Sequence, residues 1–332
     1  TIAKTITSDN IEEVYPTYYP PRKTPKECYE QIIADLTDAE QYAPDLDNSD
    51  RTIMSKTVAQ AFLAKVYAEK EVQDYDKVIE YADKVIKTNG VGLEDDFETL
   101  WGYDETAKDC LKRNTKEGIL EVHWTTGGGN WETWMYGRQL DNWDYYFTWA
   151  KWITPSRDLI NDFEKEGDEV RKNQSIVYYA CTWSNYYPAS NYPFMYKLRS
   201  SYNNEYWVRL ADIILMKAEA EAYKGNLSES ATLVNQIRKR AKLQDLTADK
   251  TSSKEAMIEA VLHERRLELA LEGERWFDLV RNNKVEEYLN GIDNRDSGRI
   301  KQQKAFDSNS YLLPIPQTAL DQNSNLQQNP GY

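Results

Sequence analysis

The sequence predicts an all-α fold in which a scaffold of paired helices carries a loop-rich, aromatic-rich insertion. Apolar residues recur at the helical spacing of three and four positions in residues 24–88 and again in residues 207–282. Between residues 90 and 206 this spacing disappears, and glycines, prolines and aromatic residues become frequent. The periodic parts are therefore expected to form the scaffold, and the middle part is expected to form the insertion.

The first helix is predicted to begin after residue 23, because the prolines before that position break any earlier helix. The stretch Thr24-Pro25-Lys26-Glu27 has the form of a capping box with proline at the first helical position. The apolar stripe of this helix is predicted to contain Cys28, Ile32, Ile33, Leu36 and Ala39.

Two antiparallel helix pairs are expected further along the chain, one over residues 56–88 and one over residues 207–242. Each pair has roughly the length of a tetratricopeptide repeat, and stacked pairs of this kind bury a shared face. The scaffold is therefore predicted to be tetratricopeptide-like. Trp207 and Trp276 are expected to be structural residues on helix faces.

The remaining signals complete the division of the chain. Capping boxes at residues 226–229 and 252–255 predict helix starts, and the second opens a long helical segment at 254–282. Within the insertion, the sequence indicates one short strand at Ile119–Trp124 and one helix at Pro155–Lys165. The expected units are an N-terminal helical scaffold, a loop-rich ligand-binding insertion, and C-terminal helical pairs with an irregular tail, at residues 1–97, 98–206 and 207–332.

The composition excludes several classes of partner. There are 41 Lys and Arg against 55 Asp and Glu, which gives a formal net charge of -14. Such a chain repels nucleic acid and anionic membrane surfaces, so neither is expected as a partner. No apolar run reaches the length of about 18 residues that a membrane-spanning helix needs. The three cysteines have neither CxxC nor zinc spacing, and no metal or other cofactor is expected.

Residues 264–281, ERRLELALEGERWFDLVR, alternate acidic and basic side chains along a predicted helix. Glu264, Glu268 and Glu272 are spaced by four positions, with arginines between them. This pattern is typical of a salt-bridged helix that packs on its neighbours. A catalytic role for these carboxylates is disfavoured, because their partners are cations and no nucleophile lies nearby in the sequence.

The same stretch strongly resembles the C-terminal signature of the SusD/RagB family, which are surface glycan-binding proteins of Gram-negative bacteria. Residues 312–332, LLPIPQTALDQNSNLQQNPGY, resemble the ending of that family through their PIP and QNPGY elements. Three further stretches agree with the family: YPPRKTPKECYEQIIADLTDAE, KTVAQAFLAKVYAEK and ITPSRDLINDFE. The resemblance extends over essentially the whole chain.

The resemblance implies a non-catalytic lipoprotein on the outer face of the outer membrane. Such a protein captures an oligosaccharide and delivers it to a SusC-type TonB-dependent transporter, which is its expected protein partner. The chain begins at Thr1 without the signal peptide, acylated cysteine and first helical portion that family members carry. It is therefore expected to be an N-terminally truncated piece, and contact with the membrane is expected only through a lipid anchor absent from this chain.

The resemblance also places the sugar-stacking aromatic residues on both sides of the helix at residues 155–165. The segment 124–152 before that helix holds six of the 10 tryptophans of the chain. A pyranose ring has an apolar C–H face that lies on an indole or phenol ring, and its hydroxyls need planar polar partners. The predicted glycan-binding residues are Trp131, Trp134, Tyr136, Arg138, Asn142, Trp143, Tyr145, Tyr146, Trp183 and Tyr187.

Some of the aromatic residues are expected to form a core instead, because an irregular subdomain also needs apolar packing. Trp124, Phe147, Trp149 and Trp152 adjoin apolar or helix-leading positions and are assigned to that core, and Trp101 is expected to be structural.

Two other functions remain open at this point. A glycoside hydrolase would also have a Trp-lined cleft, and Glu132, Asp141 and Asp144 are the only carboxylates among the rings that could form its catalytic pair. A tetratricopeptide-like scaffold could instead bind a protein or peptide. Zinc hydrolases, P-loop proteins and serine hydrolases are excluded, because the HExxH, GxxxxGK[ST] and GxSxG motifs do not occur.

Overall fold

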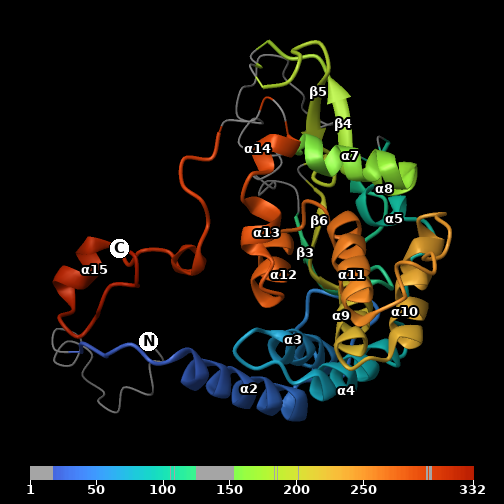
Figure 1. The fold of residues 1–332 in the computed structure, drawn as a ribbon. Helices are drawn as coiled ribbons and strands as arrows, with labels where there is room; N and C mark the ends of the chain where they lie inside the picture. The colour runs from blue at the N-terminus through green and yellow to red at the C-terminus, as the bar shows by residue number, and fades with distance from the viewer. Residues whose placement is uncertain are drawn as a thin grey trace.

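The structure of this chain is a computed structural model. It describes residues 18–104, 106–107, 109–124, 153–182, 184, 186–200, 202–296, 298 and 301–332. Most of the regular structure in these residues is helical, as the sequence predicts, with a few short strands between the helices (Figure 1).

Three helices form the N-terminal side of the scaffold, namely α2 (Pro25–Tyr42), α3 (Lys56–Ala68) and α4 (Tyr75–Ile86). The predicted capping box is present at the start of α2, where the Thr24 and Glu27 side chains bond each other's backbone N–H. The predicted apolar stripe is only partly correct. Ile33 and Leu36 pack against the main core, whereas Ile32 is 41% exposed and no residue of α2 is buried. The reason is that α2 lies at the end of the helical row and packs mainly on α3.

The C-terminal part of the scaffold is centred on α9 (Leu210–Tyr223), which packs against α4, α10 (Leu227–Arg240) and α11 (Lys254–Glu268). Every residue of α9 up to Ala222 is buried, so this helix is the centre of the main core rather than an amphipathic surface helix. The helix pair at 56–88 and the pair at 207–242 are both found, as α3–α4 and α9–α10.

The described part of the chain contains three antiparallel two-stranded sheets, only one strand of which the sequence indicated. They pair β1 (Tyr103–Asp104) with β2 (Asp109–Cys110), β3 (Gly118–His123) with β6 (Asn204–Arg209), and β4 (Ile176–Tyr179) with β5 (Tyr192–Met195). Residues 207–209 are predicted at the start of a helix and instead belong to β6. The strand forms because β3 offers a partner ladder, and Ile119, Leu120 and Val208 join the main core.

The segment 254–282 is not one long helix. It divides into α11 and a short α12 (Arg275–Arg281), with a turn between them in which Leu271 and Gly273 have positive φ values of 66° and 87°. Glycine adopts such a φ without strain, so Gly273 explains the break locally. Glu272 therefore lies beyond the end of α11 instead of continuing its row.

The other helices are short and surround this frame. They are α5 (Glu98–Trp101), α7 (Arg157–Glu166), α8 (Glu169–Ser175), α13 (Val285–Leu289), α14 (Ile292–Arg295), a 3-10 turn at Ser308–Tyr311 and α15 (Gln317–Gln322). The tail with α15 lies apart from the body beside the first described residues (Figure 1), and Asn325 and Asn323 donate to the carbonyls of Tyr19 and Pro20. None of the helices seen in these residues combines the length and the apolar character that crossing a bilayer requires.

Candidate functional site

Nine of the ten predicted glycan-binding residues lie outside the described residues. The carboxylates considered for a hydrolase, Glu132, Asp141 and Asp144, also lie outside them, as do the predicted core residues Phe147, Trp149 and Trp152. The nine are Trp131, Trp134, Tyr136, Arg138, Asn142, Trp143, Tyr145, Tyr146 and Trp183. Their role in binding stays a prediction. Of the residues assigned to the core, Trp124 is half-buried and Trp101 is 3% exposed, so Trp101 is structural as expected.

Tyr187 is the predicted site residue that the structure places. Its hydroxyl donates to the Pro155 carbonyl at 2.7 Å, and the Arg157 guanidinium lies 4.2 Å from its ring centroid. Tyr186 and Tyr192 contact the ring edge-on, and burial raises the pKa of its phenol. Tyr187 therefore holds the start of α7 in place, and whether it also touches a glycan stays a prediction.

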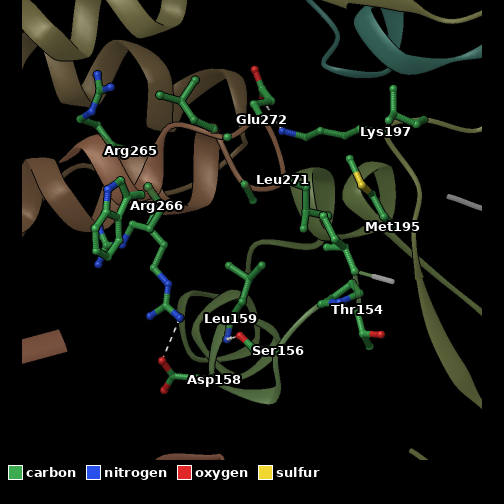
Figure 2. Close-up of a pocket in the computed structure, with 18 of the residues that line it drawn as sticks. Thr154, Ser156, Asp158, Leu159, Met195, Lys197, Arg265, Arg266, Leu271 and Glu272 are labelled. Carbon is green, nitrogen blue, oxygen red and sulfur yellow. Dashed lines mark hydrogen bonds and ion pairs between the residues drawn. The ribbon is translucent and has the colours of Figure 1, made fainter. Parts of the chain in front are cut away.

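A pocket of about 720 Å³ lies where the start of α7, β6 and the turn between α11 and α12 meet (Figure 2). This volume is in the range of small-molecule sites. Leu159, Met195 and Leu271 point into it and make its lining largely apolar. Ile153, the first described residue after the predicted aromatic segment, also lines the pocket and is 44% exposed. The pocket thus adjoins the part of the sequence in which the glycan-binding residues are predicted.

Trp207 is the most exposed aromatic residue of the pocket lining. It lies in β6 and is 60% exposed, which corrects the expectation of a structural residue on a helix face. The ladder pairs Val208 with Leu120 and Tyr206 with Glu121, so Trp207 is the extra residue of a bulge. Its neighbours in the strand turn inward, and Trp207 turns outward. The stretch NEYWVR has no regular alternation of polar and apolar residues, so it carries little local signal for this strand or its bulge.

Trp276, at the start of α12, is a second aromatic residue of the pocket lining. It lies on a helix face and is half-buried, with its ring against those of Phe306 and Tyr311 at 5.8 Å and 6.4 Å between centroids. The expectation of a structural role is therefore confirmed in part, because the same ring also borders the pocket.

Among the described residues, three carboxylates line the pocket, Asp158, Glu205 and Glu272, and cations engage Asp158 and Glu272. Arg266 binds Asp158 at 2.8 Å (Figure 2). It also pairs with Asp162. Burial acts to raise the pKa of Asp158, but the bond and charge of Arg266, together with Arg295, lower the pKa overall. Lys197 binds Glu272 at 2.5 Å, and burial lowers the pKa of this lysine to about 8.

A buried ion-pair network lies behind the pocket wall. Arg209 bonds Glu272, Glu268 and Glu117 at 2.7, 2.6 and 2.8 Å, and Arg240 bonds Glu117 at 2.5 Å and also pairs with Glu268. Of these five side chains, Glu272 is the most exposed at 10%. The interpretation of residues 264–281 as salt-bridged and packed on their neighbours is therefore confirmed.

Comparisons with known proteins agree with this architecture. The model of the SusD family matches residues 191–332. A SusD-like protein P2 from Formosa agariphila is 30% identical over 344 residues, which cover 93% of this chain and 66% of that protein. A SusD-like protein from Bacteroides ovatus is 25% identical over 78% of this chain and 51% of its own length. This chain thus spans 66% of the length of the first relative and 51% of the length of the second.

Solved structures show the same fold. A SusD superfamily protein from Bacteroides vulgatus has a TM-score of 0.75 at 22% identity, over 95% of this chain and 70% of that one. A structure described as a laminarin-binding SusD-like protein has a TM-score of 0.70 at 24% identity, over 93% of this chain and 70% of that one. The family match, the relatives and the fold together show that this chain belongs to the SusD/RagB family.

Proposed function

We propose that this chain is part of a non-catalytic cell-surface protein that captures oligosaccharides and delivers them to a TonB-dependent outer-membrane transporter. Membership of the SusD/RagB family supports glycan binding, and a SusC-type transporter is the proposed partner on the same ground. The outer face of the outer membrane is the proposed location, with a lipid anchor on the precursor.

The observation that carries this proposal is Trp207, an indole 60% exposed on the wall of an otherwise largely apolar pocket. A large exposed aromatic residue on the wall of an apolar concavity is typical of a recognition surface. An indole face matches the C–H face of a pyranose, and the contact contributes on the order of 0.5–1.5 kcal/mol beyond the buried area. The predicted aromatic residues of 124–152 are proposed to extend this surface beyond Ile153.

The described pocket offers little support for hydrolysis. A glycosidase needs two carboxyl groups at opposite sides of the bond, one of them with a raised pKa. Glu205 lines the pocket from β6, whereas Asp158 is bound by Arg266 and has a lowered pKa, and Glu272 is bound by Lys197 and Arg209. Asp158 and Glu272 are suited to holding the pocket together, so we assign them a structural role.

The proposal is tested by affinity electrophoresis of the chain in gels that contain laminarin, starch or mannan, followed by titration with the matching oligosaccharide while tryptophan fluorescence is recorded. Laminarin is included because a structural neighbour is described as binding it. Two or three stacked rings with a few hydrogen bonds predict a Kd of about 1 µM to 1 mM. Retention without release of reducing sugar is expected. Release of reducing sugar, or failure to bind any glycan, would contradict the proposal.

A further inference from the structure

The described cationic side chains that line the pocket differ in whether they have a carboxylate partner. Lys197 has Glu272, and Arg266 has Asp158 and Asp162. Arg265 has Asp212 at 2.7 Å and Asp278 at 2.8 Å. Arg275 lines the same pocket and forms no ion pair with any carboxylate in the described part of the chain.

Arg275 is nevertheless held in a fixed position. Its Nη1 donates to the Leu262 carbonyl at 3.1 Å, and its guanidinium lies 4.8 Å from the centroid of the Tyr288 ring, which also lines the pocket. The Tyr288 hydroxyl in turn donates to Glu259. One carbonyl bond uses only one of the five N–H groups of a guanidinium, so most of the donor fork is left for a ligand.

The electrostatic surroundings of Arg275 favour an added anion. Burial lowers the pKa of Arg275, and the neighbouring charge of Arg266 lowers it further. The paired Arg265 is buried as well, but its carboxylate partners raise its pKa. Asp278 and Asp162 act in the other direction on the pKa of Arg275 but form no ion pair with it, so within the described residues its charge has no direct carboxylate partner.

We propose that the pocket binds an anionic saccharide and that Arg275 receives its carboxylate or sulfate group, while Trp207 supports the sugar ring. This inference rests on the proposed function and names its ligand class. A guanidinium can donate two parallel N–H bonds to the two oxygens of a carboxylate, and the same fork can donate to two oxygens of a tetrahedral oxyanion such as sulfate. The net charge of -14 does not exclude such a ligand, because fields of distant charges are screened beyond about 8–10 Å at physiological salt.

The first test changes the ligand and leaves the protein untouched. Affinity gels would contain polygalacturonate or its methyl ester, and carrageenan or its desulfated form, so that each pair differs in one anionic group. Alginate and glucuronoxylan widen the acidic set, and laminarin, starch and mannan are the neutral set. We expect retention by an acidic polysaccharide that falls about tenfold when the group is masked, and that weakens with added salt. A fall with the polygalacturonate pair would identify a carboxylate as the group that is bound, and a fall with the carrageenan pair would identify a sulfate.

The second test changes Arg275. Arg275→Gln removes the charge, and retention by the acidic ligand is expected to fall about tenfold or more. Arg275→Lys keeps the charge, so the fall in retention is expected to be smaller. Lys239→Gln, an exposed cation of α10 outside the pocket, is the matched control for the lost charge and is expected to bind as the original chain does. Thermal unfolding checks that each variant is folded.

The outcomes separate this inference from the proposed function. Retention only by neutral polysaccharides would overturn the anionic ligand and leave glycan binding intact. Retention by none of the gels would overturn both. Equal retention of masked and unmasked polysaccharides by the folded original chain would also overturn the role of Arg275, even if the Arg275 variants failed to fold.

Discussion

The two sides of residues 264–281 differ in how their charges are balanced. On the inner side, Glu264, Glu268 and Arg281 are almost completely buried, and each binds at least two partners of opposite charge. On the pocket side, Arg266 and Glu272 are paired as well, but Arg275 lacks a carboxylate partner within the described residues. Trp276 also borders the cavity on this side. One stretch of sequence therefore stabilises the fold with one side and is available for binding with the other. Substitutions should separate these two roles.

The largest expected effect comes from the inner side, with Arg281→Met. Arg281 donates to both carboxylate oxygens of Glu219 at 2.7 Å and 2.8 Å, and Glu219 is 1% exposed. Asp278 keeps its bond to Arg265, but Glu219 would be left buried without its ion-pair partner. We expect a loss of about 3–5 kcal/mol in the free energy of unfolding, measured by urea denaturation.

Two controls sharpen this prediction. Arg295→Met removes an arginine that is 42% exposed and lies 3.5 Å from Asp158, and it should cost less than about 1 kcal/mol. The double change Arg281→Met with Glu219→Leu removes both charges and should recover much of the loss. A loss below about 1 kcal/mol for Arg281→Met alone would mean that the buried pair does not matter for stability.

On the pocket side, Trp207→Ala should change binding and leave stability nearly constant. The indole is 60% exposed, so the fold loses little buried area. Loss of one stacked ring should weaken glycan binding about two- to tenfold, measured by isothermal titration. Phe277→Ala is the matched control, because Phe277 is 55% exposed on α12 but does not line the pocket. Equal binding by both variants would remove Trp207 from the site.

The same contrast explains which features the sequence could predict. The Thr24–Glu27 box and the pairs α3–α4 and α9–α10 depend on local caps and on apolar spacing, and they are found as predicted. The pocket depends on a bulge at Trp207 and on a turn with positive φ at Leu271 and Gly273. A bulge requires knowledge of the partner strand, which lies far away in the sequence, and Leu271 gives no local signal for its conformation.

Capping signals illustrate the limits of local patterns. The capping box expected at residues 252–255 does not form, because Ser253 and not Ser252 caps the helix and accepts the N–H bond of Ala256, which has no side chain to return it. At residues 226–229 the helix starts as expected, but the Asn226 side chain donates to Glu221 instead of capping the helix. Tertiary partners outside the motif decide these details, so the sequence locates a helix start more reliably than it identifies the atoms that cap it.

The smallest expected effect lies at the rim of this segment, where His263 meets Glu166 at 3.1 Å. The bond from His263, with the charge of Arg238, lowers the pKa of Glu166 to about 2 from its ordinary 4.5. A carboxyl with a lowered pKa in the folded state stabilises the fold above pH 4.5, and this contribution is lost as the pH falls from about 5 towards 2. Since Glu166 is 25% exposed and His263 34%, the contribution should not exceed about 1 kcal/mol.

His263→Ala tests this assignment through the pH dependence of unfolding. The variant should be less stable than the original chain near pH 5, and the difference should shrink as the pH falls towards 2, because Glu166 is increasingly protonated in both. Urea denaturation at several pH values between 2 and 6 measures the difference. A constant difference across this range would show that His263 acts through packing alone. A larger difference at pH 2 than at pH 5 would contradict the sign of the coupling.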